Sequence, residues 1–287
     1  MEHRPEGHDL DVRKHLQFGV HDGDRLTGDY YAPLGAGPYP TLVAVHGGGW
    51  QLGTADSYQS WGPYLAHRGY VLLAINYRLV RETKNRYPAA VHDTRAAVQF
   101  LRSQAAALKV DPNRIGCMGD SAGAHLAALV ALAGDSSPFA DAYPHDPYAG
   151  VSTHVKVVVG IYGVYDLLAQ WQPDQLTRPR DHITERFLGK SPMDSKHLFY
   201  EASPLTYTTI DKNHTAFLVV WGTDDDMVEP RSQSQVFVTA LKQAGFFVRT
   251  VIVPGAPHFW VREPIDEPTS YTGFLAPRLL RFLQNQL

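Results

Sequence analysis

The chain has 287 residues, of which 44% are hydrophobic and 19% charged, a composition that supports a large buried core and excludes a disordered chain. Its formal net charge of −3 offers neither the basic surface that nucleic acids bind nor a patch for an anionic membrane. We therefore expect a small molecule as partner, with no nucleic acid and no membrane.

Cysteine content and hydropathy indicate the compartment. The single cysteine, Cys117, excludes an intrachain disulfide and fits a reducing environment. The N-terminal sequence MEHRPEGHDLDVRKH has no apolar run of the signal-peptide type. No stretch approaches the ~20 apolar residues that span a bilayer. We expect a cytoplasmic protein, and a homodimer is one assembly open to it.

Strand-like apolar runs alternate with longer helical patterns along the chain. Residues 16–20 and 26–31 flank His21-Asp22-Gly23-Asp24 and are predicted to form a hairpin. Later strand candidates are mostly continuous rather than alternating, as expected where both faces of a sheet are covered. They are residues 41–45, 71–75, 114–118, 155–161, 216–220 and 247–253. The helix candidates are residues 58–68, 89–108, 122–133, 231–244 and 271–286. Pro112 is expected in a turn before the strand at 114–118.

This alternation predicts an α/β fold with a mostly parallel, doubly wound sheet and an antiparallel start, in one domain over residues 1–287. Residues 166–209 carry aromatics and prolines but no strand pattern. We interpret them as an inserted lid over the carboxyl ends of the strands, where ligands bind in open sheets. The alternative is a surface excursion without a role, which loops of this length in compact domains rarely are.

The sequence Gly119-Asp120-Ser121-Ala122-Gly123 matches G-x-S-x-G. It follows one strand candidate and opens a helix, so small residues on both sides of the serine force a tight elbow that exposes the hydroxyl. The helix N-terminus adds free N–H groups and the positive end of the helix dipole. Ser121 is the candidate nucleophile; the alternative is a serine that caps the helix.

A serine nucleophile needs a base and a carboxylate, and in a strand–elbow–helix fold of this kind they follow in the order Ser, Asp or Glu, His. His258 lies between the last strand and last helix candidates, in a loop that can return over Ser121. Other histidines have other expected places: His125 is expected to pack or hydrogen-bond, and surface positions are expected for His3, His8, His15 and His21.

The carboxylate is expected just after residues 216–220, where Asp224, Asp225 and Asp226 follow one another. The residue types alone leave Asp225 and Asp226 open. An oxyanion hole is also required. Its N–H donors are expected from Ala122 and from the glycines of His46-Gly47-Gly48-Gly49-Trp50.

Other chemistries lack their motifs. The glycine run has no G-K-[ST] ending of a phosphate-binding loop, and no G-x-G-x-x-G occurs with a distal acid. No H-E-x-x-H and no cysteine pair support a zinc site, so no metal and no cofactor are expected.

The motifs HGGGW, GDSAGAHL, GTDDDMV and PGAPHFW, in this order, resemble those of the α/β-hydrolase carboxylesterases, over the chain from about Leu16 onward. That group includes hormone-sensitive-lipase-like esterases, feruloyl- and acetyl-xylan-esterase-like enzymes and arylformamidases. The resemblance implies the following roles: Ser121 as nucleophile, His258 as base, Asp225 as acid through G-x-x-D-x-x-V, and Gly47, Gly48 and Ala122 as oxyanion donors. It also implies that Tyr77, Arg78 and Asp93 are structural supports.

Two features depart from the hormone-sensitive-lipase pattern. Few residues precede the first strand, so residues 166–209 must replace the usual helical cap. The run SAGAH is similar to arylformamidases, whereas Asp120 and the third glycine of HGGGW favour esterases.

The resemblance implies a serine carboxylesterase that hydrolyses small or aromatic carboxylic esters through an acyl-enzyme. The alternatives are an arylformamidase that cleaves N-formylkynurenine and a non-catalytic binding protein on the same fold. Trp50, Phe199 and Trp260 are candidate substrate-binding residues; such aromatics equally well anchor a lid.

Overall fold

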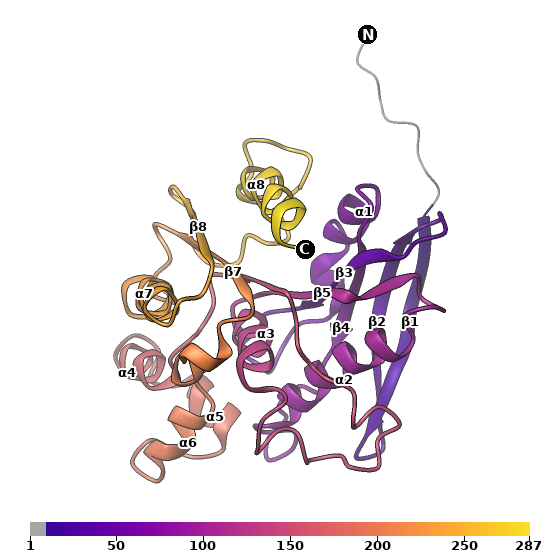
Figure 1. The fold of residues 1–287 in the computed structure, drawn as a ribbon. Helices are drawn as coiled ribbons and strands as arrows, with labels where there is room; N and C mark the ends of the chain where they lie inside the picture. The colour runs from indigo at the N-terminus through magenta and orange to yellow at the C-terminus, as the bar shows by residue number, and fades with distance from the viewer. Residues whose placement is uncertain (1–9) are drawn as a thin grey trace.

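The computed structural model describes residues 10–287, and eight strands form a single sheet in the order β1-β2-β4-β3-β5-β6-β7-β8 (Figure 1). The strands are β1 (Leu10–His21), β2 (Asp24–Pro33), β3 (Tyr39–Val45), β4 (Val71–Asn76), β5 (Val110–Asp120), β6 (Val157–Ile161), β7 (Ala216–Gly222) and β8 (Val248–Val253). β1 and β2 are antiparallel, β2 joins β4 antiparallel, and the pairs from β4 through β8 are parallel. The predicted α/β fold, with a hairpin start and a mostly parallel sheet, is confirmed.

Helices cover both faces of the sheet (Figure 1). They are α1 (Trp61–Ala66), α2 (Ala89–Ser103), α3 (Ala122–Ala133), α4 (Leu167–Thr177), α5 (Ile183–Leu188), α6 (Lys196–Glu201), α7 (Val236–Gln243) and α8 (Tyr271–Gln286). Shorter helical turns are η1 (Ala55–Tyr58), η2 (Pro204–Tyr207), η3 (Ile210–Lys212) and η4 (Arg231–Gln235). None of the helices within residues 10–287 is both long and apolar enough to cross a membrane.

Two hydrophobic cores lie on opposite faces of the sheet. Side chains alternate along β5, so Cys117 packs with residues of α2, α3 and α7, and Met118 packs with residues of α1 and α8. Burial on both faces explains why the parallel strands are continuous apolar runs. The sheet is therefore covered on both faces, and the carboxyl end of β5 carries the Ser121 elbow.

Two local expectations are wrong. Pro112 lies inside β5, where pairing with β3 shifts from Tyr39–Val110 to Thr41–Ile115; this irregularity leaves the proline out of the ladder. His21 is only 2% exposed because the chain between α3 and β6 folds over the end of β1. His3 and His8 lie outside the described residues, and His15 is exposed, as predicted.

The carboxylates of Asp93 and Asp146 flank the His21 ring at 2.8 and 3.2 Å, and Tyr143 stacks on it. Asp93 also binds the Arg78 guanidinium and accepts the Arg78 N–H at 2.8 Å. This network fixes the loop after β4.

Residues 166–209 form α4, α5, α6 and η2, which gather beside α3 and α7 in Figure 1. α4 begins where the Asp166 carboxylate accepts the N–H groups of Leu168 and Ala169, a side-chain N-cap. Gln233, in η4, holds the same entry point, because its amide oxygen accepts the N–H groups of Tyr165 and Asp166. The segment is thus anchored to the sheet domain where it leaves β6.

Candidate active site

Ser121 sits in a sharp elbow between β5 and α3. Its φ of 50° and ψ of −119° are uncommon for a residue with a side chain, so the surrounding structure must hold it. The Ser121 N–H donates to the Ile161 carbonyl at 2.9 Å, and the His125 N–H donates to the Ser121 carbonyl at 3.1 Å. A Cβ on Gly123 would lie 1.9 Å from the Val45 carbonyl oxygen. The elbow therefore requires the small residues of its motif.

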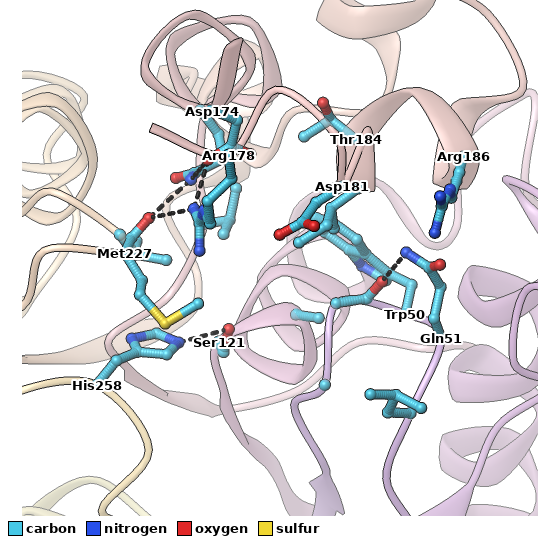
Figure 2. A pocket seen from close by; sticks show the side chains of 18 of the residues that line it. Trp50, Gln51, Ser121, Asp174, Arg178, Asp181, Thr184, Arg186, Met227 and His258 are labelled. Carbon is cyan, nitrogen blue, oxygen red and sulfur yellow. Dashed lines mark hydrogen bonds and ion pairs between the residues drawn. The ribbon is translucent and has the colours of Figure 1, made fainter. Parts of the chain in front are cut away.

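Ser121, His258 and Asp225 form one hydrogen-bonded series. The Ser121 Oγ lies 3.0 Å from His258 Nε2, and His258 Nδ1 lies 2.7 Å from the Asp225 Oδ2. The dashed line between Ser121 and His258 in Figure 2 marks the first of these contacts. Because a carboxylate only accepts, Nδ1 carries the ring proton, and Nε2 is free to accept the serine proton. All three residues are buried.

The second carboxylate oxygen distinguishes Asp225 from its neighbours. Asp225 Oδ1 accepts the backbone N–H groups of Met227 and Val228 at 3.0 and 2.9 Å, which fixes the carboxylate plane. Asp224 and Asp226 are exposed. The structure therefore brings Asp225, and neither neighbour, to the histidine.

Asp120 is a buried carboxylate directly under the elbow. It accepts the Gly47 N–H and the Tyr58 hydroxyl, each at 3.0 Å. Burial raises the pKa of Asp120 above its ordinary value, and these hydrogen bonds oppose that rise. Asp120, the residue before Ser121, thus holds the start of the glycine loop through the Gly47 N–H.

The bond between Gly47 and Asp120 corrects the expectation that Gly47 is an oxyanion donor. The Gly47 N–H is directed at Asp120 and is not free to bind an oxyanion. Gly48, Gly49 and Ala122 line the pocket together with Ser121, and their N–H groups find no acceptor among residues 10–287. The free donors at the pocket are therefore those of the second and third glycines and of Ala122.

Ser121 and His258 line a pocket of about 420 Å³, part of which is shown in Figure 2. Its apolar wall is lined by Trp50, Leu52, Val164, Ile183, Met227, Val228 and Phe259. Its polar wall comes mainly from α4, α5 and the turn between them, and contains Gln170, Asp174, Arg178, Asp181, Thr184 and Arg186. A substrate would meet Ser121 at the base and residues 166–209 above it.

A polar cluster on α4, missed by the sequence interpretation, binds the loop that carries Asp225. Asp174 is only 4% exposed and accepts hydrogen bonds from the side chains of Gln170 and Arg178. Both side chains also donate to the Met227 carbonyl, at 2.8 and 3.1 Å; Figure 2 shows the bond from Arg178. The spacing i, i+4, i+8 of these polar residues on one helix face was the available signal.

The three aromatic candidates occupy different places. Trp50 lines the pocket, and its ring stacks on Phe187 at 4.3 Å. Phe199 and Trp260 are 0% and 1% exposed and are absent from the pocket wall. Phe199 packs into the core that includes α3, and Trp260 packs against Tyr162 in the opposite core. Of the three, only Trp50 lines the pocket, although its side chain is also nearly fully buried.

His125 contacts neither the Ser121 hydroxyl nor the pocket, and both of its ring nitrogens are hydrogen-bonded elsewhere.

Within the described part of the chain, no three His, Cys, Asp or Glu side chains cluster in a way that could hold a metal ion.

Comparison with known proteins identifies relatives over most of the chain. The BD-FAE family model matches residues 29–241. Esterase LipQ of Mycobacterium tuberculosis is 32% identical over 208 residues, which are 72% of this chain and 46% of that protein. The probable isoprenylcysteine alpha-carbonyl methylesterase ICMEL1 of Arabidopsis thaliana is 27% identical over 88% of this chain and 52% of its own. The chain spans about half the length of the curated relatives it matches.

Solved structures share the fold. Propionate-bound Est2, an esterase of Thermogutta terrifontis, superimposes with a TM-score of 0.74 at 23% identity, covering 95% of this chain and 94% of its own. A bifunctional GH43-CE protein of Bacteroides eggerthii gives a TM-score of 0.78 at 24% identity, covering 96% of this chain and 35% of its own.

Proposed function

The chain belongs to the BD-FAE family of α/β-hydrolase carboxylesterases, and from this premise we propose that it is a serine carboxylesterase acting on small or aromatic carboxylic esters. The observation that carries the proposal is the hydrogen-bonded series from Asp225 through His258 to Ser121, beside free backbone N–H groups in one pocket. A hydroxyl, a base and an oxyanion site together are the requirements of acyl transfer.

In the proposed mechanism, Ser121 Oγ attacks the ester carbonyl carbon while His258 Nε2 takes its proton. Asp225 holds the ring in the required tautomer and stabilises the imidazolium. The C–O bond to the alcohol breaks, and the alcohol leaves with the proton from His258. Water then attacks the acyl-enzyme, and its proton passes to His258. The bond between Ser121 Oγ and the acyl carbon breaks as His258 returns that proton to Oγ, which releases the acid and restores the free serine.

The N–H groups of Gly48, Gly49 and Ala122 are the proposed oxyanion donors. They stabilise the negative charge that develops on the carbonyl oxygen in the transition state and that the ground-state ester lacks. Gly47 does not bind the oxyanion in this proposal; its N–H bond to Asp120 fixes the start of the loop that carries the donors.

Residues 166–209 are proposed as a cap inserted into a single domain. Support comes from their position over Ser121 and from the bonds that Gln170 and Arg178 make to the Met227 carbonyl, two residues after Asp225. A cytoplasmic location and a homodimer stay predictions from the sequence.

The experiment is a substrate panel on the wild-type protein and Ser121→Ala. We expect hydrolysis of p-nitrophenyl acetate, butyrate and benzoate, and a fall in kcat of about 10⁴-fold or more in the variant. Sizeable activity in Ser121→Ala would refute the mechanism. Faster cleavage of N-formylkynurenine than of every ester would favour an arylformamidase, and a complete lack of turnover would favour a binding protein.

A further inference from the structure

His125 is a fully buried histidine four residues after Ser121, in the first turn of α3. Its Nδ1 lies 3.1 Å from the indole Nε1 of Trp50, and its Nε2 lies 2.7 Å from the Ala202 carbonyl oxygen. An indole N–H only donates and a carbonyl only accepts, so the proton must be on Nε2 and Nδ1 must accept. The ring thus joins the glycine loop on one side to the segment 166–209 on the other.

The neutral form of this ring is required for the bond to Trp50. A protonated ring would present N–H groups on both sides, and one of them would face the indole N–H. Burial lowers the pKa of His125 to about 4, while its bond to Ala202 opposes the shift. The ring is therefore neutral at physiological pH, and the bond to Trp50 persists.

Trp50 has a backbone that needs outside support. Its φ of 61° lies in the left-handed region, which an aromatic residue rarely adopts. Three contacts hold it: the indole bond to His125, the stacking on Phe187 at 4.3 Å, and its carbonyl, which accepts the Val80 N–H at 2.9 Å.

The position of Trp50 determines the direction of the preceding peptides. It directly follows Gly48 and Gly49, whose φ values of 112° and 57° are also left-handed. Trp50 lies inside the turn that the Gly48 carbonyl closes by accepting the N–H groups of Gln51 and Leu52 at 3.1 and 3.0 Å, so a shift of Trp50 would move this turn and the flexible glycine peptides before it. Gly47 is anchored at the other end by Asp120. The donors lie between these two fixed points.

We propose that His125 is a positioning residue: by accepting the Trp50 indole N–H, it fixes the glycine loop so that the Gly48 and Gly49 N–H groups point at the oxyanion. The inference rests on the proposed esterase function and adds a residue that touches neither the substrate nor the reacting atoms. Donors misplaced by a fraction of a bond length lose stabilisation mainly in the transition state. Loss of the bond should consequently lower kcat more than it raises KM.

Two amide variants separate the two bonds of the ring. The side-chain oxygen of His125→Asn lies near the Nδ1 position and can still accept from Trp50. The side-chain amide of His125→Gln reaches toward the Nε2 position and can still donate to Ala202, but it leaves the indole unpaired. We expect His125→Gln to lose about tenfold to 100-fold in kcat, with KM and the pH profile nearly unchanged. His125→Asn should recover most of that kcat.

Trp50→Phe tests the same bond from its other end, since it removes the donor and keeps a ring that can stack on Phe187. If the bond is the operative contact, the double variant Trp50→Phe/His125→Gln will lose little more than either single variant. The affinity for a trifluoromethyl ketone, which forms a tetrahedral oxyanion adduct, should fall in parallel with kcat. Thermal unfolding identifies variants that do not fold, and Trp50→Phe keeps the test available if His125→Gln is one of them.

The outcomes are distinct. Equal losses in His125→Gln and His125→Asn, additive losses in the double variant, or a change confined to KM would overturn the positioning role while ester hydrolysis by the wild-type protein stands. Absence of ester hydrolysis in the wild-type protein would instead overturn the proposed function, and this inference with it.

Discussion

Replacing Asp225 by asparagine should abolish most activity, because the two carboxylate oxygens of Asp225 bind different partners. Asp225 Oδ1 accepts two backbone N–H groups, from Met227 and Val228, so the amide oxygen of asparagine must occupy that side. The amide NH₂ then faces His258 Nδ1, which can only accept from it. The ring proton moves to Nε2 and points at Ser121, so the base is lost.

The expected loss follows from that change of tautomer. We expect kcat to fall by ~10³–10⁴-fold, about 4–5.5 kcal/mol in the activation barrier, with a small change in KM. The assay is steady-state hydrolysis of p-nitrophenyl acetate, with thermal unfolding as a check that the variant is folded.

Asp226→Asn is the matched control, one position along the same loop. Asp226 is exposed, and its substitution should change kcat by no more than about twofold, within ~0.5 kcal/mol. The reasoning is refuted if Asp226→Asn loses as much as Asp225→Asn, or if Asp225→Asn keeps most of the wild-type rate.

Three further predictions concern packing, selectivity and pH. Gly123→Ala places a Cβ 1.9 Å from a backbone oxygen, so the free energy of unfolding in urea should drop by about 3 kcal/mol; unchanged stability would contradict the elbow geometry. Phe199→Ala should lower the free energy of unfolding by about 3–5 kcal/mol and leave the ranking of esters by kcat/KM unchanged, because Phe199 is buried in the core. Ile183→Trp, on the pocket wall, should lower kcat/KM for bulky esters. The reverse pattern would place Phe199 at the substrate. Burial lowers the pKa of His125 to about 4, below the unfolded value near 6.5. Between these two pH values, the unfolded chain therefore binds a proton that the folded protein does not bind. The contribution of the neutral His125 to stability is thus present above pH ~6.5 and is lost as the pH falls toward 4. His125→Asn should therefore flatten the dependence of the unfolding free energy on pH by up to about 1.4 kcal/mol per pH unit in that window, and an unchanged slope would count against a buried neutral ring.

The fold could be predicted because the signals were local. Continuous apolar runs indicated strands covered on both faces, and alternation with helical patterns indicated a parallel sheet. The elbow motif at Ser121 combined a strand end, small residues and a helix start within a few positions. Chain order was enough to predict which of the 14 histidines lies beside the Ser121 hydroxyl, namely His258.

Other features depend on contacts between distant segments. Gly47 and Gly48 look alike in sequence, and only the position of Asp120 shows which N–H is already used. His21 is buried by a segment more than 100 residues away, which contributes Asp146. Its local sequence, a polar hairpin turn, gave no sign of that cover.

The aromatic residues of segment 166–209 also show that contacts between distant segments cannot be read from the local sequence. Aromatic content indicates packing or binding but does not tell which face a helix turns to the pocket. Phe199, on α6, turns to the core, whereas Asp174 on α4 and Arg178, the residue that follows α4, line the pocket. Orientation of a short helix is set by its tertiary neighbours, which the sequence pattern alone does not reveal.

The central claim, that Ser121 is the nucleophile activated by His258, is tested most directly by fluorophosphonate labelling followed by peptide mapping in a mass spectrometer. A fluorophosphonate forms a covalent bond only with an activated serine, and its adduct mimics the tetrahedral intermediate. The account predicts one labelled peptide carrying the adduct on Ser121, and no labelling of Ser121→Ala. An adduct on another residue, or equal labelling of Ser121→Ala, would contradict it.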